Sequence, residues 1–438
     1  MTARKKHKRS RKRGLHPLPL LLLILFFLCA AAAAWWFLSH PYGTEDQSAT
    51  EQAGQSPDGE TPEQKPDGTE ETPAGAGAAE SGKETPEVEP SEEEILEEQA
   101  RELLSTMTLE EKVGQMFIAR CPEEDAAEKA DAYHLGGYIL FARDFEGKTP
   151  EQAAADIQSF QEASKLPMLI GVDEEGGTVN RISRYPAFRQ EPFPSPQELY
   201  QEGGFEAVRE DTLEKCRLLK SLGVNVNFAP VCDVSQDPSD FIYERSFGQD
   251  AGLTAEYVKT VVEAMKGQGV ACVLKHFPGY GNNTDTHTGI AYDNRPYETF
   301  ETSDFLPFEA GIGSGAQMVL VSHNIVSCMD AQYPASLSPK VHELLREELG
   351  FDGVIVTDDL SMDGVRDFTD DSSAAVLAVQ AGNDLLCCTD FETQIPAVLD
   401  AVEDGSISRD RIDESVLRIL KMKNSCGICD PLTARQQT

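Results

Sequence analysis

Charged side chains stand at the ends of many of the apolar runs in this sequence. The end of a buried strand is where a reactive side chain can meet a substrate. These side chains are Arg143, Asp173, Asp233, Lys275, His276, His323, Asp358 and Asp359. Carboxylates and imidazoles are the groups that most often transfer protons or attack an electrophilic carbon. The histidines are too scattered to predict a zinc site, and no GxSxG elbow predicts a serine hydrolase. The pattern therefore favours a site for such chemistry, and we expect neither a metal nor a cofactor there.

Eight short apolar runs must position these side chains. The runs are 116–120, 136–142, 167–173, 224–234, 270–277, 316–324, 352–359 and 383–389. Their hydrophobicity is continuous rather than alternating, which is typical of strands buried on both faces of a parallel sheet. Helical patterns separate most of them, for example at 150–165, 254–269 and 338–350. Eight β/α repeats predict an α/β protein with a single (β/α)8 TIM-type barrel, whose chemistry lies at the carboxyl ends of its strands.

A doubly wound open sheet is the alternative fold. The sequence contains no glycine-rich phosphate loop of either nucleotide-binding type, so a nucleotide fold has little support.

The charge of the 438-residue chain is −37, and it is unevenly distributed. Residues 1–40 carry +8, residues 41–100 carry −16 and the remainder carries −29. Such an acidic chain would repel a phosphate backbone, so we expect no nucleic-acid partner.

The basic residues 1–40 and the acidic residues 41–100 predict segments separate from the barrel. An uncharged apolar run from Leu18 to Leu38 is about 30 Å long as a helix, enough to cross a bilayer. We therefore expect a basic cytoplasmic segment at 1–16, a transmembrane signal-anchor at 17–40, a disordered linker at 41–92 and a catalytic barrel at 93–430. The barrel would then lie outside a cell membrane. The alternative is a secreted protein whose signal peptide is cleaved near Ala30 to Ala34.

Ten cysteines are present, and most lie in apolar runs where a thiol behaves as a small buried hydrophobe. Cys426 and Cys429 have CxxC spacing without a second pair, so we expect no metal site there, with a local disulfide as the alternative.

Several motifs resemble glycoside hydrolase family 3, and the β-N-acetylhexosaminidase branch in particular. They are MTLEEKVGQMF (107–117), LGGYILFAR (135–143), GVDEEGGTVNRI (171–182), NFAPVCDV (227–234), ERSFG (244–248), LKHFPGYGNNTDTHTG (274–289), PASLSPKV (334–341) and GVIVTDDLSMDGV (353–365). The resemblance covers about residues 100–425 in the family's order. It implies a retaining glycosidase on a barrel, with Asp358 as the nucleophile. Asp359 is expected to be structural, because adjacent strand residues point to opposite sides.

In this branch a histidine on a loop replaces the usual carboxylic acid, and the resemblance assigns that role to His287. Asp285, two residues earlier, would fix the imidazole tautomer and raise its basicity. His287 could then protonate the leaving oxygen and later activate water.

The same resemblance implies a set of substrate-binding residues. They are Asp173, Arg181, Arg245, Lys275 and His276, while Asp233 and His323 are expected to support them. Aspartate can accept hydrogen bonds from sugar hydroxyls, and the cations can donate to hydroxyl or acetamido oxygens.

Three departures from the family pattern affect specificity. Tyr280 replaces the histidine of PGHG, the loop from Gly281 to Asp285 is about one residue shorter, and Thr178 stands where arginine is common. We expect catalysis to survive these changes.

The sequence therefore predicts an exo-acting β-N-acetylglucosaminidase that acts on peptidoglycan fragments or related glycans, with a monomer favoured. A β-glucosidase or β-xylosidase, a glycoside phosphorylase of the same family, and a non-catalytic sugar-binding protein are the alternatives.

Overall fold

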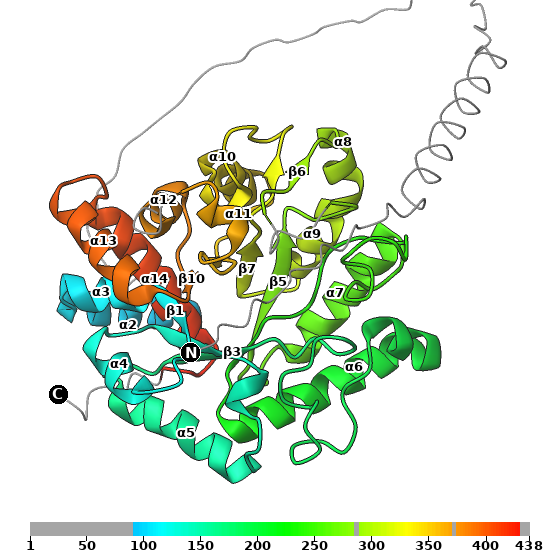
Figure 1. Cartoon of the computed structure of the whole chain (residues 1–438), viewed down its shortest axis with the longest axis horizontal. Helices are drawn as coiled ribbons and strands as arrows, with labels where there is room; N and C mark the ends of the chain where they lie inside the picture. The colour runs from blue at the N-terminus through cyan, green and yellow to red at the C-terminus, as the bar shows by residue number, and fades with distance from the viewer. Residues whose placement is uncertain (1–90, 284–288, 370–373, 430–438) are drawn as a thin grey trace, which may run out of the picture. The chain divides into compact units, whose positions relative to one another are not determined.

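The structure is a computed structural model that describes residues 91–283, 289–369 and 374–429. Its main sheet has eight parallel strands in the order β10-β1-β2-β3-β4-β5-β7-β9 (Figure 1). These strands are β1 (Phe117–Arg120), β2 (Gly137–Leu140), β3 (Leu169–Val172), β4 (Val226–Asn227), β5 (Ala271–Phe277), β7 (Met318–Val321), β9 (Val354–Thr357) and β10 (Leu386–Cys388). Each lies within one of the eight predicted runs, so this prediction is confirmed.

The first and last strands of that order, β10 and β9, meet and nearly close the sheet into a barrel. Val356 of β9 forms a parallel bridge to Leu385, and the Thr357 N–H donates to the Leu385 carbonyl (3.1 Å). The Thr357 hydroxyl also accepts the Cys387 N–H (3.0 Å). The open-sheet alternative is therefore excluded.

Each strand is followed by a helix that returns the chain to the next strand. The larger ones are α4 (Ala126–Ala132), α5 (Pro150–Ala163), α6 (Pro196–Leu222), α7 (Ala251–Met265), α9 (Phe305–Gly313), α10 (Pro339–Glu343), α12 (Ala374–Ala381) and α13 (Phe391–Glu403). Figure 1 shows the helices outside the strands. The helices cover the outer face of the sheet, so its strands are buried on both faces. This burial explains why the strands are uniformly hydrophobic and why strands and helices alternate along the chain.

Among the described residues, three helices lie outside the eight repeats: α2 (Glu92–Thr106), α3 (Leu109–Gln115) and α14 (Arg409–Ser425). Ser91 caps the start of α2. The Ser91 hydroxyl accepts the Glu94 N–H (3.3 Å), and the Ser91 N–H donates to the Glu94 carboxylate (2.8 Å). This reciprocal capping satisfies two backbone donors at the start of the helix.

Shorter elements complete the connections between the strands. They are η1 (Ala142–Asp144), β6 (Tyr292–Asp293), α8 (Tyr297–Thr299), η3 (Phe300–Asp304), β8 (Ile325–Val326), η4 (Ala335–Leu337), η5 (Leu344–Glu348) and α11 (Asp363–Arg366). β6 and β8 pair in parallel and join the connections that follow β5 and β7.

One part of the predicted fold class is wrong. The prediction placed a transmembrane helix before the barrel, whereas no helix among the described residues is both long and apolar enough to span a bilayer. The longest, α6, carries charged side chains along its whole length because only one of its faces packs on the barrel. The residues assigned to the transmembrane helix, 17–40, and those assigned to the linker up to residue 90 lie outside the described residues.

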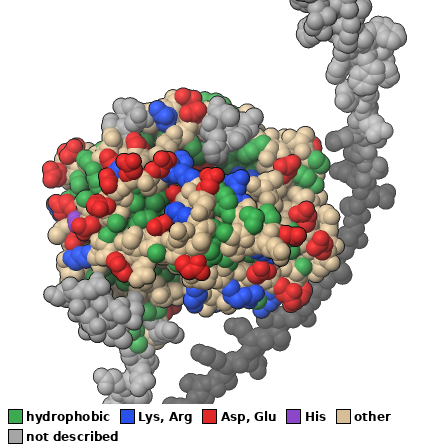
Figure 2. Space-filling model, turned by 60° about the horizontal axis from the view of Figure 1, so that its bottom comes forward, with side chains coloured by type: hydrophobic (Ala, Val, Ile, Leu, Met, Phe, Trp, Pro, Cys, Tyr) green, Lys and Arg blue, Asp and Glu red, His purple; other side chains and the backbone are tan. Residues whose placement is uncertain are grey.

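The acidic charge of the described part lies largely on its surface. Figure 2 shows acidic side chains spread over the visible face with Lys and Arg side chains among them. Seven of the nine described cysteines are buried, as expected for small apolar side chains. No disulfide joins Cys426 and Cys429.

Candidate active site

A pocket of about 420 Å³ lies at the carboxyl ends of the barrel strands. It brings together six of the eight residues that the sequence singles out for catalysis and binding. These are Asp173, Arg181, Arg245, Lys275, His276 and Asp358. They lie in β5 or follow β3, β4 and β9, so they are distant in the chain and meet only because the sheet curves into a barrel.

Asp358 and Asp359 both line the pocket, but their surroundings differ. The Asp358 N–H donates to the Val321 carbonyl (3.1 Å), which fixes the end of β9 against β7. The Asp359 carboxylate accepts hydrogen bonds from the Ser361 N–H (2.9 Å) and hydroxyl (2.8 Å) and from the Thr389 hydroxyl (2.6 Å). His323 donates from Nε2 to the Asp359 carbonyl (3.0 Å). These contacts suit Asp359 and His323 to structural roles around Asp358.

A buried network of ion pairs forms one wall of the pocket. The Lys275 ammonium contacts Asp173 (2.7 Å) and Glu175 (2.6 Å), and only 2% of the Lys275 side chain is exposed. Arg245 donates to both carboxylate oxygens of Glu175, from Nε (3.0 Å) and Nη2 (2.8 Å). Burial by itself would raise the pKa of Glu175, but the charges of Arg245 and Lys275 outweigh it and hold that pKa well below its ordinary value. Glu175 therefore stays ionised and keeps both cations in place.

His276 is oriented by contacts at both ring nitrogens. Nδ1 lies 2.7 Å from the Asp233 carboxylate, and Nε2 lies 3.2 Å from Arg245 Nη2. Because arginine can only donate, Nε2 accepts and Nδ1 carries the hydrogen that Asp233 accepts. Asp233 also accepts the Tyr280 N–H (2.8 Å), and the Tyr280 ring packs edge-on against His276 with the centroids 5.0 Å apart. The tyrosine that departs from the family pattern thus supports the histidine ring.

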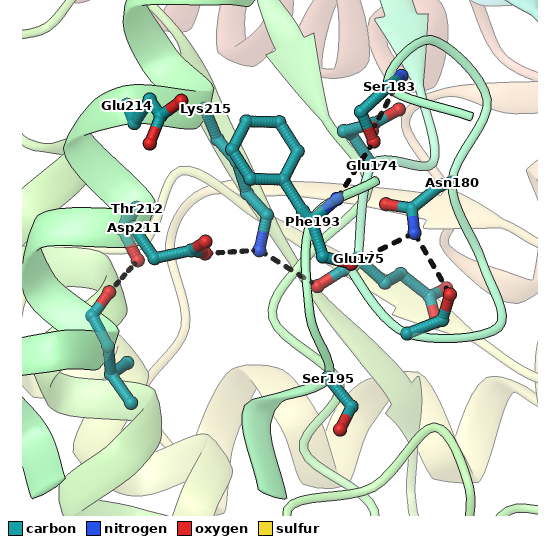
Figure 3. Close-up of polar contacts among 12 residues, drawn as sticks. Glu174, Glu175, Asn180, Ser183, Phe193, Ser195, Asp211, Thr212, Glu214 and Lys215 are labelled. Atoms are coloured by element: carbon teal, nitrogen blue, oxygen red, sulfur yellow. Dashed lines mark hydrogen bonds and ion pairs between the residues drawn. The ribbon is translucent and has the colours of Figure 1, made fainter. Parts of the chain in front are cut away.

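The loop after β3 is held by Glu174, which is fully buried. Its carboxylate accepts the N–H groups of Arg181 (2.9 Å) and Ile182 (2.8 Å) and contacts the Ser183 hydroxyl. Figure 3 shows this loop beside Lys215 of α6. Lys215 donates to the Glu175 carbonyl (3.1 Å) and pairs with Asp211 (2.6 Å). A helix on the outside of the barrel thus anchors the backbone of a residue that shapes the pocket.

Two predicted catalytic residues, Asp285 and His287, lie outside the described residues. Arg295, which follows these two residues in the chain, contacts described residues on both sides of them. Its guanidinium donates to the Gly279 carbonyl (3.2 Å), to Asp293 (2.8 Å) and to Asp304 (3.0 Å).

Comparison with known proteins identifies the family. The model of the glycosyl hydrolase family 3 N-terminal domain matches residues 108–422. The chain belongs to glycosyl hydrolase family 3. It is therefore a glycoside hydrolase, and the resemblance found in the sequence is confirmed.

Relatives within family 3 carry consistent names. The chain is 32% identical to beta-hexosaminidase LpqI of Mycobacterium tuberculosis over 333 residues, which cover 72% of this chain and 84% of LpqI. The solved structure of M. tuberculosis LpqI has a TM-score of 0.67 at 30% identity and covers 74% of this chain and 96% of that one. A family 3 beta-N-acetylglucosaminidase from Paenibacillus sp. FPU-7 has a TM-score of 0.69 at 33% identity, and 74% of this chain matches 63% of its length.

Sequence reasoning missed three charged residues at the pocket: Arg120 lines it, while Glu174 and Glu175 hold residues that line it. Arg120 ends the first apolar run as Asp173 ends the third, so the strand-end rule could have found it. The two glutamates follow Asp173 directly, but their partners lie elsewhere in the chain. Conversely, Arg143 follows β2 without joining the pocket, because its guanidinium contacts Glu123 (2.5 Å) and the Cys121 carbonyl (2.6 Å).

Proposed function

We propose that this protein is a retaining exo-β-N-acetylglucosaminidase that removes terminal β-linked N-acetylglucosamine from peptidoglycan fragments or related glycans. The observation that carries the proposal is the pocket in which Asp358 lies with Asp173, Lys275, His276 and Arg245. The family 3 relatives named beta-hexosaminidase and beta-N-acetylglucosaminidase support the choice of sugar.

In the first step the ionised Asp358 carboxylate attacks the anomeric carbon, and the bond from that carbon to the leaving oxygen breaks. His287 donates a proton to this oxygen while Asp285 stabilises the imidazole. The product is a glycosyl-enzyme ester on Asp358 and a free aglycone hydroxyl.

In the second step His287 accepts a proton from water, and the water oxygen attacks the anomeric carbon. The ester bond breaks and Asp358 returns to its ionised state. Throughout, Asp173 accepts from sugar hydroxyls while Lys275 and Arg245 donate to sugar oxygens, and Glu175 prevents the two cations from separating. Two inversions at the anomeric carbon retain its configuration.

The test is a substrate panel on the full-length protein. It compares 4-nitrophenyl N-acetyl-β-glucosaminide, β-glucoside and β-xyloside, each with and without inorganic phosphate. We expect the first to be turned over most rapidly, with free N-acetylglucosamine as the product in both conditions. Faster turnover of the glucoside or xyloside would contradict the proposed sugar, and a sugar phosphate as the product would contradict hydrolysis.

A further inference from the structure

Arg120 differs from the other cations that line the pocket. It is half-buried at the carboxyl end of β1, and its guanidinium carbon lies 4.7 Å from the centroid of the Phe141 ring. Its Nε–H is buried without a hydrogen-bond partner, which is also true of Arg181. Within the described part of the chain, no carboxylate lies within 4 Å of the Arg120 guanidinium. An arginine carries five N–H donors and no acceptor, so such a group is suited to bind an acceptor from a ligand.

The other three cations of the pocket are engaged. Lys275 pairs with Asp173 and Glu175, Arg245 pairs with Glu175, and Arg181 lies 3.4 Å from Asp173. Their charges are therefore balanced within the protein, whereas the charge of Arg120 is not balanced at ion-pair distance by any described residue.

The Asp144 carboxylate and the Arg120 guanidinium interact at longer range. Burial raises the pKa of Asp144, and the charge of Arg120 is one of several that oppose this rise. The Asp144 carboxylate is already occupied, since it accepts the Phe141 N–H (2.7 Å). Asp144 also lines a different cavity, together with Arg143 and Lys148.

The barrel places Arg120 where a bound sugar would meet it. β1 is separated from β9, which precedes Asp358, only by β10. In the ring of eight strands β1 lies opposite β5, which carries Lys275 and His276. A sugar held between Asp358 and β5 would therefore present one of its edges to Arg120.

We propose that Arg120 binds an oxyanion carried by the substrate, a carboxylate or a sulfate, and so makes the enzyme selective for negatively charged glycans. The planar guanidinium matches either oxyanion with paired hydrogen bonds, and such charge-assisted bonds are stronger than neutral ones. This inference rests on the proposed function and adds a substrate class to it.

The test compares anionic and neutral N-acetylglucosaminides on the full-length protein. One arm pairs 4-nitrophenyl N-acetyl-β-glucosaminide with its 6-sulfate, which places the anion on the terminal sugar. The other pairs N,N′-diacetylchitobiose with N-acetylglucosaminyl-β-1,4-N-acetylmuramic acid, which places a carboxylate on the leaving sugar. We expect at least one anionic substrate to have a kcat/KM about 10-fold or more above that of its neutral counterpart. The arm that shows the preference identifies where the oxyanion is carried.

Arg120→Met keeps an apolar side chain against Phe141 and removes the charge. It should lower kcat/KM for the preferred anionic substrate by about 10- to 100-fold and change the neutral one by less than about 3-fold. Arg120→Lys should retain part of the preference. Arg143→Met, at the next strand end but outside the pocket, is the matched control and should leave the preference unchanged.

If the neutral substrates are turned over and the anionic ones are not preferred, the role of Arg120 is contradicted but the proposed function is not. Equal losses on neutral and anionic substrates in Arg120→Met also contradict it, since a purely structural role would affect both. Absence of turnover of every N-acetylglucosaminide contradicts the proposed function, and the role of Arg120 with it.

Discussion

Asp358 and Asp359 are neighbours in the chain and both line the pocket, and we propose Asp358 as the nucleophile. The carboxylate of Asp359 is occupied by Ser361 and Thr389. Asp358 lies across the pocket from the cations that we propose to hold a sugar. The surroundings of each side chain, rather than its type, separate the two roles.

Replacing Asp358 by Asn removes the anionic nucleophile and keeps nearly the same volume. We expect kcat for 4-nitrophenyl N-acetyl-β-glucosaminide to fall by about 10³-fold or more, because the glycosyl-enzyme cannot form. Added azide should restore turnover and yield an α-glycosyl azide, which NMR would identify. Asp352→Asn, an exposed position before the same strand, should leave kcat unchanged. An Asp358→Asn variant with normal kcat would overturn the assigned mechanism.

Glu175→Gln tests the charge that holds Lys275 and Arg245 together. Without that charge two buried cations repel each other, so we expect a loss of about 3 kcal/mol in the free energy of unfolding. We also expect kcat/KM to fall by about 100-fold, because both sugar-binding cations lose their position. Urea denaturation and steady-state kinetics measure the two effects.

The pH dependence of Glu175→Gln has a defined sign. The folded protein holds the pKa of Glu175 below the ordinary value of 4.5, so its stabilisation is present above about pH 4.5 and is lost as the pH falls further. The difference in stability between the native protein and the variant should therefore shrink below that pH. Glu123→Gln is the matched control, since Glu123 is 75% exposed in its pair with Arg143 and should contribute less than about 1 kcal/mol. Equal losses in both variants would contradict the special role of Glu175.

At the scale of elements, α6 and the loop after β3 form one unit. Lys215 of α6 holds the backbone of Glu175, and Glu174 holds the N–H groups of Arg181 and Ile182. The position of the pocket cations thus depends on a helix that does not line the pocket.

Lys215→Met breaks this connection and leaves Asp211 as a buried charge without its partner. We expect a loss of about 3 kcal/mol of stability by urea denaturation and an increase in KM larger than the decrease in kcat. The double variant Lys215→Met with Asp211→Leu should recover part of the stability, because no unpaired charge stays buried.

The matched control for Lys215 is Lys148→Met. Its pair with Asp156 is nearly as short (2.7 Å, against 2.6 Å for Lys215 and Asp211), but the two side chains are 34% and 49% exposed. It should cost less than about 1 kcal/mol. A double variant no more stable than Lys215→Met would show that the loss does not come from the unpaired Asp211.

At the scale of the whole barrel, Lys423 of α14 joins the last helix to the first three repeats. Its side chain is fully buried and donates to the Gln115 side chain (2.7 Å) and to the carbonyls of Gly136 (3.2 Å) and Pro167 (2.8 Å). These acceptors stand just before β1, β2 and β3. One side chain thus connects the amino ends of three strands to the C-terminal helix.

This burial predicts a rise of stability with pH. Burial lowers the pKa of Lys423 from 10.5 to about 8, so between these values the unfolded chain binds a proton that the folded protein does not. Stability should therefore increase from about pH 8 to about pH 10.5 by about 3 kcal/mol relative to Lys423→Met. Lys421→Met, at a partly exposed position on the same helix, should follow the native pH dependence. A constant difference between the native protein and Lys423→Met across this range would contradict the prediction.

Local pattern was sufficient to predict the eight strands and the helices between them, because burial on both faces and helical periodicity depend on near neighbours in the chain. The strand-end rule also found Asp173, Lys275 and Asp358. It was wrong for Arg143, whose side chain turns to Glu123 outside the pocket. The predicted transmembrane helix was the wrong part of the fold class, and the roles of Asp285 and His287 stay predictions.

The sequence by itself therefore determined the family, the barrel and the nucleophile candidate, since these follow from periodicity and from contiguous motifs. Only the tertiary structure decided which charges are balanced. Glu175, after β3, meets Arg245, after β4, and Lys275 of β5, and Arg120 meets no carboxylate at ion-pair distance within the described residues. Such pairings join residues that are far apart in the chain, and no local pattern encodes them because the curvature of the sheet brings them together.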